Sequence, residues 1–371
     1  MLFDSLQIRD IVLRNRLVVS PMCQYSSTDG FANDWHLVHL GTRAVGGAAL
    51  VFTEATAVVP EGRISPQDLG IWKDDHIEIL ARITKFIHSQ GTLAGIQLAH
   101  AGRKGSTARP WEGGKEVPVS QGGWIPFSPS DVPFADDYPK PIALDEHQIR
   151  ATVQAFADAA RRACDAGFDV IEIHAAHGYL LHEFLSPLSN FRFDSYGDTL
   201  ENRTRIVREV VTAVRNLVPK GMPLFIRISV SDWLQGGWDI DQSIALAGQI
   251  VPLGVDLVDC SSGGISPEAN AKIKVAPGYQ VPFAEEIRQA TGVLTGTIGM
   301  ITSASQADTI LREGRADVIL MAREFLRQPY WPLNVAHVEG YPASWPVQYL
   351  RAAAQGTPAR EPLEGARSQT E

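Results

Sequence analysis

An apolar, strand-like run ends in a polar cluster at Ile171-Glu172-Ile173-His174-Ala175-Ala176-His177-Gly178-Tyr179. Side chains of a β-strand alternate with a period of two, so His174 and His177 would face opposite ways if the strand continued between them. They converge only if the chain leaves the strand there, as it does at the C-terminal end of a strand in a β/α unit. Two neutral donors and a phenol would then surround one small space, where such a trio can polarise a carbonyl oxygen and deliver a proton.

Two other interpretations of these histidines stay open at this point. A histidine at a strand end is often a structural residue with its hydrogen bonds satisfied inside the protein. Paired histidines are also common zinc ligands, but no third ligand is evident nearby. Glu172 shares its parity with His174 and is expected to point into the strand layer.

Short apolar runs alternate with amphipathic helical stretches along most of the chain. The strand candidates are 16–20, 49–53, 93–98, 170–173, 224–228, 257–260, 293–298 and 318–321. The helical stretches between them include 75–89, 145–166, 204–217, 241–251, 284–290 and 305–313. Eight strands with intervening helices predict an α/β fold, a closed (β/α)₈ TIM barrel, rather than an open doubly wound sheet. The absence of clean alternation is typical of strands covered on both faces, and no Gly-x-Gly-x-x-Gly follows the first strand.

The barrel is expected to occupy residues 1–355 as a single domain. A long loop excursion, 102–141, follows the third strand and is rich in Gly, Pro and Trp, as loops that cover active sites often are. Residues 356–371 are polar and lack periodicity, which predicts a disordered C-terminal tail.

Composition and charge narrow the class of protein. A net charge of −9, without a lysine–arginine cluster interleaved with aromatic residues, argues against a nucleic-acid partner. No apolar run reaches the length of a membrane span, and the first residues lack the pattern of a signal peptide. The three cysteines, Cys23, Cys164 and Cys260, are too scattered for a disulfide framework. A cytoplasmic protein without a membrane partner is therefore expected.

Polar residues recur where the predicted strands end. Residues at the C-terminal ends of barrel strands face the ligand. Those positions hold Ser20-Pro21-Met22-Cys23, Glu54-Ala55, Gln97 with His100, His174 with His177, Arg227, 261–264, Gly299-Met300 and Arg323. Only Glu54 is a well-placed carboxylate, which argues against a glycosidase because that chemistry needs a pair. The set is typical of a site for a flat, anionic ligand with many hydrogen bonds, and its glycines and arginine at strands seven and eight lie where barrels often hold a phosphate.

From Leu2 to about Arg351 the chain resembles the flavin-dependent Old Yellow Enzyme family. The resemblance is greatest to its bacterial thermophilic-like branch of ene-reductases and xenobiotic reductases. The motifs that carry it are Leu13-Arg14-Asn15-Arg16, Ser20-Pro21-Met22-Cys23-Gln24-Tyr25, Gly95-Ile96-Gln97-Leu98-Ala99-His100-Ala101-Gly102-Arg103-Lys104, His174 to Tyr179, 185–190 and Glu201-Asn202-Arg203.

The resemblance implies a bound FMN. It assigns contacts with the flavin ring to Ser20, Pro21, Met22, Cys23 and Ala55, and the pyrimidine edge to Gln97. Arg227 would lie beside N1 and O2, where a guanidinium stabilises the charge of the reduced ring. Gly299, Met300, Ala322 and Arg323 would hold the phosphate. Cys23 would tune the redox potential without forming a bond, although a buried inert cysteine is its alternative interpretation.

The resemblance also implies the reaction. NADPH or NADH would reduce the flavin, and a small electron-poor alkene would then take its place. His174 and His177 would bind the carbonyl or nitro oxygen of that α,β-unsaturated substrate, Tyr25 would contact the same activating group, and flavin N5 would return the hydride. Tyr179 would protonate the α-carbon from the opposite face.

Three departures or extensions of the family pattern concern residues near the implied site. Ala322 stands where the branch usually has glycine, so its methyl group would approach the phosphate. Asp198-Thr199 replaces a Gly-Ser pair, which would stiffen that turn. The segment ending at Arg351 resembles one that reaches a neighbouring subunit's site, which implies a homodimer or homotetramer with Arg351 binding substrate.

Other functions stay open at the level of the sequence. A flavin-dependent dehydrogenase of cyclic ketones would use the same residues in the oxidative direction. A metal-dependent barrel hydrolase would use His174 and His177 as ligands, and a non-enzymatic flavin store would leave Tyr179 without a purpose. The sequence predicts the ene-reductase.

Overall fold

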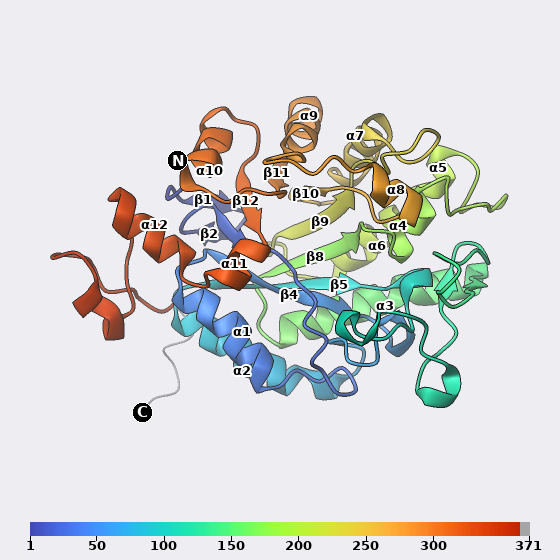
Figure 1. The fold of residues 1–371 in the computed structure, drawn as a ribbon, viewed down its shortest axis with the longest axis horizontal. Helices are drawn as coiled ribbons and strands as arrows, with labels where there is room; N and C mark the ends of the chain where they lie inside the picture. Colours follow the sequence, from blue (N-terminus) through green and yellow to red (C-terminus); the bar gives the residue numbers. More distant parts are fainter. Residues whose placement is uncertain (364–371) are drawn as a thin grey trace.

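Eight parallel strands close into a barrel in the computed structural model, which describes residues 1–363. Figure 1 shows the strands running through the middle of the molecule with helices on both sides. In chain order the barrel strands are β3 (Leu17–Val19), β4 (Leu50–Ala57), β5 (Leu93–Ala99), β8 (Val170–Ala175), β9 (Leu224–Ser229), β10 (Leu257–Ser261), β11 (Leu294–Thr297) and β12 (Val318–Met321). Each coincides with a predicted strand, and β12 pairs with β3 to close the ring, so the predicted TIM barrel is confirmed.

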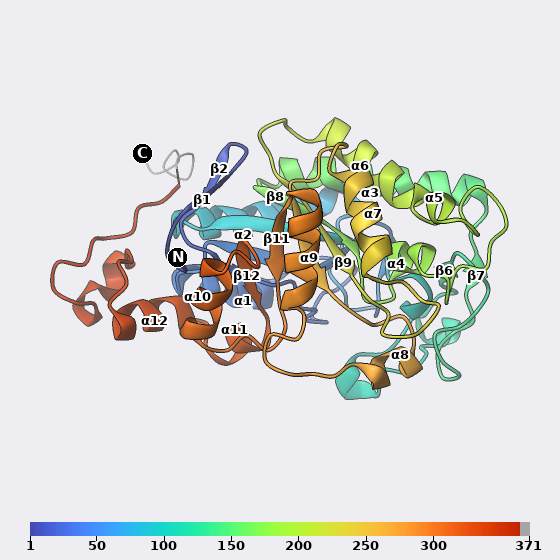
Figure 2. The same cartoon turned by 90° about the horizontal axis from the view of Figure 1, so that it is seen from above.

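Helices surround the barrel between successive strands. They are α1 (Asp34–Val45), α2 (Ile77–Ser89), α3 (Glu146–Asp165), α6 (Arg205–Leu217), α7 (Ile240–Ile250), α9 (Val281–Thr291) and α10 (Ala304–Arg312). α12 (Trp331–Glu339) and the short helices α4 (Leu180–Leu185), α5 (Leu200–Arg203), α8 (Pro267–Lys272) and α11 (Arg323–Arg327) complete the set in the described part of the chain. Figure 2 shows α3 beside α6 and α7 beside α9, and these pairs pack against each other.

Only α1 among the barrel's outer helices lies outside the predicted stretches. Its buried face carries His36 and His39 beside Leu40 and Ala44, so the apolar period is broken by imidazoles. Asn33 begins the helix, because its side chain accepts from the backbone N–H of Trp35 and forms a capping box with His36.

Two ends of the barrel have different covers. The hairpin of β1 (Leu6–Ile8) and β2 (Ile11–Leu13) packs Ile8 and Leu13 into an interior cluster with Phe52 and Phe225. At the opposite end lies the excursion after β5, with the short strands β6 (Phe127–Ser128) and β7 (Ile142–Ala143). Figure 2 shows these two pairs of strands at opposite ends of the molecule. The predicted loop excursion after the third strand is thus present.

The C-terminal segment differs from the prediction of a disordered tail from residue 356. Arg360 is 9% exposed and donates to the carbonyl oxygens of Ala44 (3.0 Å) and Val45 (2.9 Å) at the end of α1. The last carbonyls of a helix lack partners within it, and a cation is favourable there, so this arginine fixes residues 356–363 to the barrel domain. The remainder of the predicted tail, 364–371, lies outside the described residues.

None of the helices within residues 1–363 combines the length and the apolar character needed to cross a membrane.

Candidate active site

His174, His177 and Tyr179 meet at the C-terminal end of β8. The strand ends at Ala175, and His177 adopts a left-handed φ of 61°. The ring centroid of His174 lies 5.2 Å from that of His177 and 5.1 Å from that of Tyr179, both edge to face. The predicted convergence, with the chain leaving the strand between the histidines, is what the structure shows.

Three hydrogen bonds from other elements hold this turn. The backbone N–H of His177 donates to Oγ of Ser229 (2.8 Å), and Nζ of Lys104 donates to the His177 carbonyl (2.9 Å). The N–H of Gly178 donates to Nδ1 of His182 (2.8 Å). Gly178 has a φ of 70°, and a Cβ there would collide with the carbonyl of Gly264, so only glycine fits. These partners hold the left-handed backbone of His177 and Gly178 in place.

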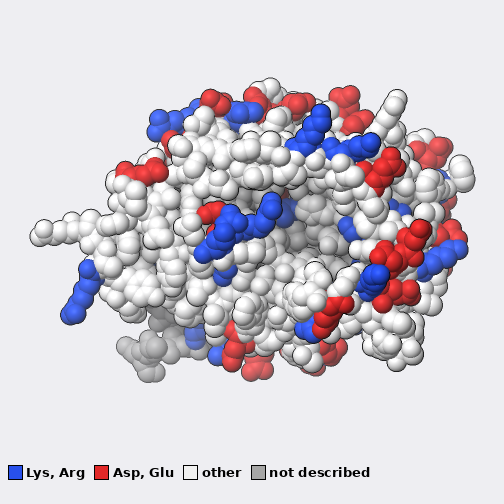
Figure 3. Space-filling view, viewed as in Figure 1, with Lys and Arg blue, Asp and Glu red and all other residues white. Residues whose placement is uncertain are grey.

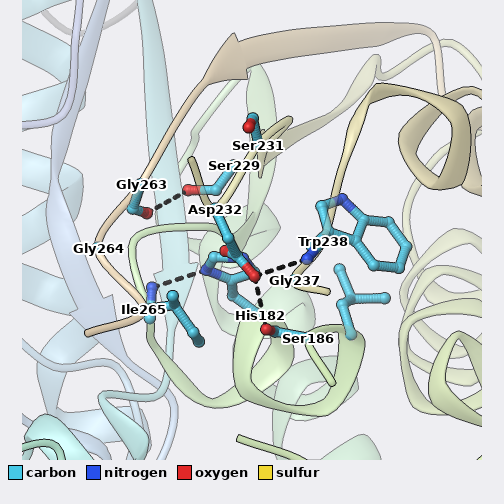
Figure 4. Close-up of polar contacts among 12 residues, drawn as sticks. His182, Ser186, Ser229, Ser231, Asp232, Gly237, Trp238, Gly263, Gly264 and Ile265 are labelled. Carbon is cyan, nitrogen blue, oxygen red and sulfur yellow. Dashed lines mark hydrogen bonds and ion pairs between the residues drawn. The ribbon is translucent and has the colours of Figure 1, made fainter. Parts of the chain in front are cut away.

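A buried pair of side chains, His182 and Asp232, supports the turn (Figure 4). Because Nδ1 of His182 accepts from Gly178, its Nε2 carries the proton, and Nε2 lies 3.0 Å from Oδ1 of Asp232. Oδ2 of Asp232 accepts from Oγ of Ser186 (2.6 Å) and from the N–H of Trp238 (2.7 Å). Burial alone would raise the pKa of Asp232, but His182 and these donors outweigh it and lower the pKa.

Replacing Asp232 by asparagine is expected to lower the free energy of unfolding by about 1–3 kcal/mol at neutral pH, because a buried hydrogen-bonded charge is lost. Since the folded-state pKa of Asp232 is lowered, its contribution exists above the unfolded pKa of about 4 and is lost as pH falls through the folded value. Denaturant unfolding at neutral and acid pH should show the difference from wild type shrinking on acidification. The exposed Asp241→Asn on α7 removes the same charge and should have little effect. A constant difference at all pH values would contradict this.

The three groups at the mouth of the barrel are uncharged. Burial, followed by neighbouring cations, lowers the pKa of His177, and burial together with the adjacent His177 lowers that of His174. Burial raises the pKa of Tyr179, so its phenol keeps its proton. Nδ1 of His174 is buried without a partner among the described residues, and Nε2 of His177 lies 2.7 Å from Oγ of Ser261. The site therefore offers neutral donors beside a protonated phenol.

A cavity of about 330 Å³ opens beside this cluster. Among the residues that line it are Ser20, Pro21, His177, Arg227, Gly299, Met300, Ala322 and Arg323, all predicted site residues, together with Tyr279, Gln280 and Arg327. Figure 3 shows Lys and Arg side chains gathered beside a hollow in the middle of that face, over the region of α11 in the same view. Gly299 has a φ of 122°, and a Cβ there would press on the ring of Tyr279, so the glycine keeps this wall open.

Arg227 lies at the floor of the cavity within a buried polar cluster. Its Nε donates to Oδ2 of Asp259 (2.5 Å), and its Nη2 donates to Oγ of Ser20 (2.9 Å). Nε2 of Gln97 donates to Oε1 of Glu172 (2.8 Å), and that oxygen lies 3.9 Å from Nε of Arg227. Glu172 therefore lies inside the barrel beside Arg227 and is not a metal ligand of the histidines.

The loop after β3 forms another side of the site. Glu54 on β4 accepts from the backbone N–H of Gln24 (2.9 Å) and lies 3.1 Å from Nε2 of His36, so it holds the segment that carries Met22 and Cys23. Burial, aided by nearby Asp68 and Glu54, raises the pKa of Cys23, which therefore remains a thiol. Ala55 is buried one residue beyond Glu54, next to Gln97 in the strand register.

Tyr25 lies under the excursion. It has a left-handed φ of 50°, and its ring meets that of Trp111 edge to face at 5.8 Å. Within the excursion, the ring of Phe134 lies 4.4 Å from Nζ of Lys104, the lysine that donates to the carbonyl of His177. The predicted cover thus contacts residues of the site.

Arg351 stays apart from this cluster within its own chain. It is exposed on a short 3₁₀ helix, Val347–Ala352. Figure 1 shows the red C-terminal segment to the side of the barrel, beside α12.

Two departures from the family pattern have visible consequences. Ala322, which directly precedes α11, lines the cavity and has a φ of −110°. Asp198 adopts a left-handed φ of 66°, which costs energy for a residue other than glycine, and Thr199 caps α5 by accepting from the N–H of Asn202 (3.3 Å).

Several site residues were not singled out from the sequence. Contacts between strands and loops that are far apart in the chain reveal the roles of Lys104, His182, Asp232, Asp259 and Ser261. Asp259 offered a signal, since a carboxylate inside an apolar strand two residues before Ser261 is expected to face the barrel interior. Within residues 1–363, no group of three or more His, Cys, Asp or Glu side chains is arranged to hold a metal ion.

Comparison with known proteins agrees with this geometry. The model of the NADH:flavin oxidoreductase / NADH oxidase family matches residues 1–339. The chain is 49% identical over 352 residues to an NADPH dehydrogenase of Geobacillus thermodenitrificans, covering 94% of this chain and 98% of that one. It superposes on the Old Yellow Enzyme homologue of Zymomonas mobilis with a TM-score of 0.77 at 26% identity, covering 98% and 99% of the two chains. Morphinone reductase in complex with tetrahydroNAD gives a TM-score of 0.74 at 25% identity, covering 100% and 99%.

Proposed function

This chain belongs to the NADH:flavin oxidoreductase / NADH oxidase family, and from that premise we propose that it reduces activated C=C bonds of α,β-unsaturated carbonyl or nitro compounds. It is an NAD(P)H oxidoreductase with FMN as its cofactor. The observation that carries the substrate class is the meeting of His174, His177 and Tyr179, all uncharged, beside a cavity floored by Arg227.

The residues around the cavity fit FMN. Arg323 supplies a cation, the Gly299 turn allows a close backbone approach, and the two support a phosphate. Arg227 lines the cavity as a fixed donor, and Gln97 joins the same buried cluster through Glu172, which suits the polar edge of a flat ring. When bound, FMN supplies the hydride chemistry between a nicotinamide and the substrate.

His174 and His177 are proposed to bind the activating oxygen of the substrate. Both rings are neutral and each can donate one N–H, so together they withdraw electron density from the conjugated alkene without a formal charge. The turn of His177 is fixed by Ser229, Lys104 and His182, so little reorganisation accompanies binding. Tyr25 and the excursion would close over the same group.

Tyr179 is proposed to donate the proton to the α-carbon. Its raised pKa keeps the phenol protonated, and its ring lies against that of His174. The ammonium group of Lys104, 5.2 Å from the Tyr179 ring centroid, would favour the phenolate that forms. Water or a neighbouring donor restores the proton afterwards.

Replacing Tyr179 by phenylalanine should separate the two half-reactions. Reduction by NADPH is expected to remain within about twofold of wild type, because that step needs no proton from Tyr179. Reoxidation by enones should slow by about tenfold, less than the usual 10²–10⁴ for a general acid, because water can substitute. Stopped-flow absorbance of the two steps provides the measurement. Unchanged reoxidation across several enones would assign the proton to another group.

The visible spectrum of the purified protein tests the proposal as a whole. A yellow protein that releases FMN on denaturation and bleaches anaerobically with NADPH is expected, with NADH as the alternative donor. Return of the colour on adding an enone distinguishes the reductase from a dehydrogenase that oxidises cyclic ketones, and a metal-dependent hydrolase would show neither change. A colourless protein that cannot be reconstituted with FMN would overturn the proposal.

We propose that the protein is cytoplasmic and assembles into a homodimer or homotetramer. In that assembly, Arg351 of one chain would complete the site of a neighbouring chain. Replacing Arg351 by alanine is then expected to raise KM for an enone about fivefold, corresponding to about 1 kcal/mol for one exposed charge, with FMN affinity unchanged. A point substitution is preferable to truncation because truncation also removes the contacts of Arg360. The exposed Arg82→Ala on α2 is the matched control. A fully active monomer, or kinetics identical to wild type, would remove Arg351 from the site.

A further inference from the structure

Four neighbouring strands bring two acids, one cation and one amide together in the barrel interior. The strand register pairs Gln97 on β5 with Glu172 on β8, and Arg227 on β9 with Asp259 on β10. All four residues are buried, with at most 3% of the surface of each residue exposed. Buried groups of this kind have no water to bind, so they must find their hydrogen-bond and charge partners among themselves.

The charges of Arg227, Glu172 and Asp259 do not balance if both acids are ionised. Arg227 forms its closest ion pair with Asp259, whereas its Nε lies 3.9 Å from Oε1 of Glu172. Glu172 has only the amide of Gln97 as a close donor among the described residues outside the acid pair. An unpaired carboxylate in a buried site costs several kcal/mol, which a bound proton removes.

The remaining oxygens of the two acids point to the place of that proton. Oε2 of Glu172 and Oδ1 of Asp259 are buried without a hydrogen-bond partner among the described residues. The two carboxyl groups are near enough for each to act on the pKa of the other. A hydrogen on one of the two acids would give both oxygens a partner, because a carboxylic acid can donate to a carboxylate whereas two carboxylates cannot donate to each other.

Other groups around the pair do not supply the missing positive charge. On β8 and the turn after it, His174 and His177 are neutral, and the thiol of Cys260 beside Asp259 has a pKa raised by burial. Ser20 contributes only a hydroxyl, to Arg227. Burial, and then the charge of Asp259, raises the pKa of Glu172, while Arg227 opposes the rise.

We propose that Glu172 and Asp259 share one proton beneath the flavin-binding cavity, with the hydrogen on Glu172, and that loss of this proton weakens binding of the reduced flavin. The second half rests on the proposed function, because it needs the negative charge of reduced FMN to lie beside Arg227. With the proton in place, the triad of Arg227, Glu172 and Asp259 has no net charge. Without it, the triad carries one net negative charge, which repels the reduced ring more than the oxidised one.

Infrared spectroscopy tests the shared proton without any turnover. In protein without cofactor and with oxidised FMN, the carbonyl stretch of a buried protonated carboxyl group should appear at neutral pH, shift in D₂O, and disappear in Glu172→Gln. Asp259→Asn should remove the same band, because Glu172 then pairs with Arg227 as a carboxylate. Glu183→Gln, at another buried acid, is the control and should leave this band intact. A band that survives both substitutions would overturn the proposal.

The redox potential tests the effect on the flavin. Wild type and Glu172→Gln carry the same flavin, so the flavin's own pH dependence cancels in the difference between their midpoint potentials. The amide of the variant imitates the protonated acid. The two midpoint potentials should coincide at neutral pH. In alkaline solution wild type should bind reduced FMN about tenfold more weakly, about 30 mV lower for a two-electron couple. Potentials that run parallel over the whole range would contradict the proposal.

Failure of this inference is distinguishable from failure of the proposed function. If the protein binds FMN but reduces no enone, the infrared band and the potentials still report on the acid pair. If enones are reduced but the band is absent, only the shared proton is wrong.

Discussion

Replacing His177 by alanine is expected to slow reoxidation of the reduced enzyme by enones by about 30- to 1000-fold. Loss of one donor to a developing oxyanion costs on the order of 2–4 kcal/mol in transition-state stabilisation. The effect should be near the upper end of that range, because the ring is neutral, lines the cavity, and sits on a backbone that Ser229 and Lys104 hold in place. Binding of phenols, which imitate an enolate oxygen, should weaken in parallel.

A conservative variant separates the donor role of His177 from a packing role. His177→Asn retains an N–H at a similar position and should recover part of the lost rate, whereas alanine should not. His174→Ala removes the second donor and should behave similarly. If both alanine variants reduced enones at wild-type rates and bound phenols normally, the histidines would be structural.

Replacing Arg227 by methionine in the cofactor-free protein is expected to lower the free energy of unfolding by about 3–5 kcal/mol, because breaking a buried pair leaves its acids uncompensated. Glu172 and Asp259 have raised pKa values in the folded state, so their unfavourable ionisation grows as pH rises above the unfolded values and disappears on acidification. Denaturant unfolding should therefore show the variant losing stability from acid to neutral pH.

Removing the two acidic charges should reverse this loss. Adding Glu172→Gln and Asp259→Asn to Arg227→Met leaves no uncompensated charge, and most of the lost stability should return. A variant Arg227→Met that is as stable as wild type at neutral pH would show that the triad does not hold the charges assigned to it.

The barrel could be predicted because its strands carry their signal locally. Each is an apolar run without alternation, followed by polar residues that mark its C-terminal end, as with Arg227 and Ser261. The convergence of His174 and His177 was also predictable, since their opposite parity demands a turn. Helix α1 was missed because imidazoles on its buried face interrupt the apolar period, and they are tolerated there by partners such as Glu54.

The support of the site could not be predicted in the same way. His182 pairs with Asp232 from another loop, and Glu172 on β8 approaches Asp259 on β10 across the intervening strand β9. Each pair depends on strand registers that one sequence does not reveal. Arg360 was assigned to a disordered tail because its neighbours are polar, yet its partners are helix-end carbonyls more than three hundred positions away. Local pattern predicts elements, whereas these contacts depend on how the elements pack.

Reduction of an enone in D₂O under anaerobic conditions, with NADPH as donor, tests the central claim most directly. Mass and NMR analysis of the product should show a saturated ketone with solvent deuterium at the α-carbon and hydrogen from the donor at the β-carbon. This pattern follows if the histidines hold the oxygen and Tyr179 protonates the α-carbon. An enone left unreacted while NADPH bleaches the flavin, or deuterium from solvent at the β-carbon, would contradict the assignment.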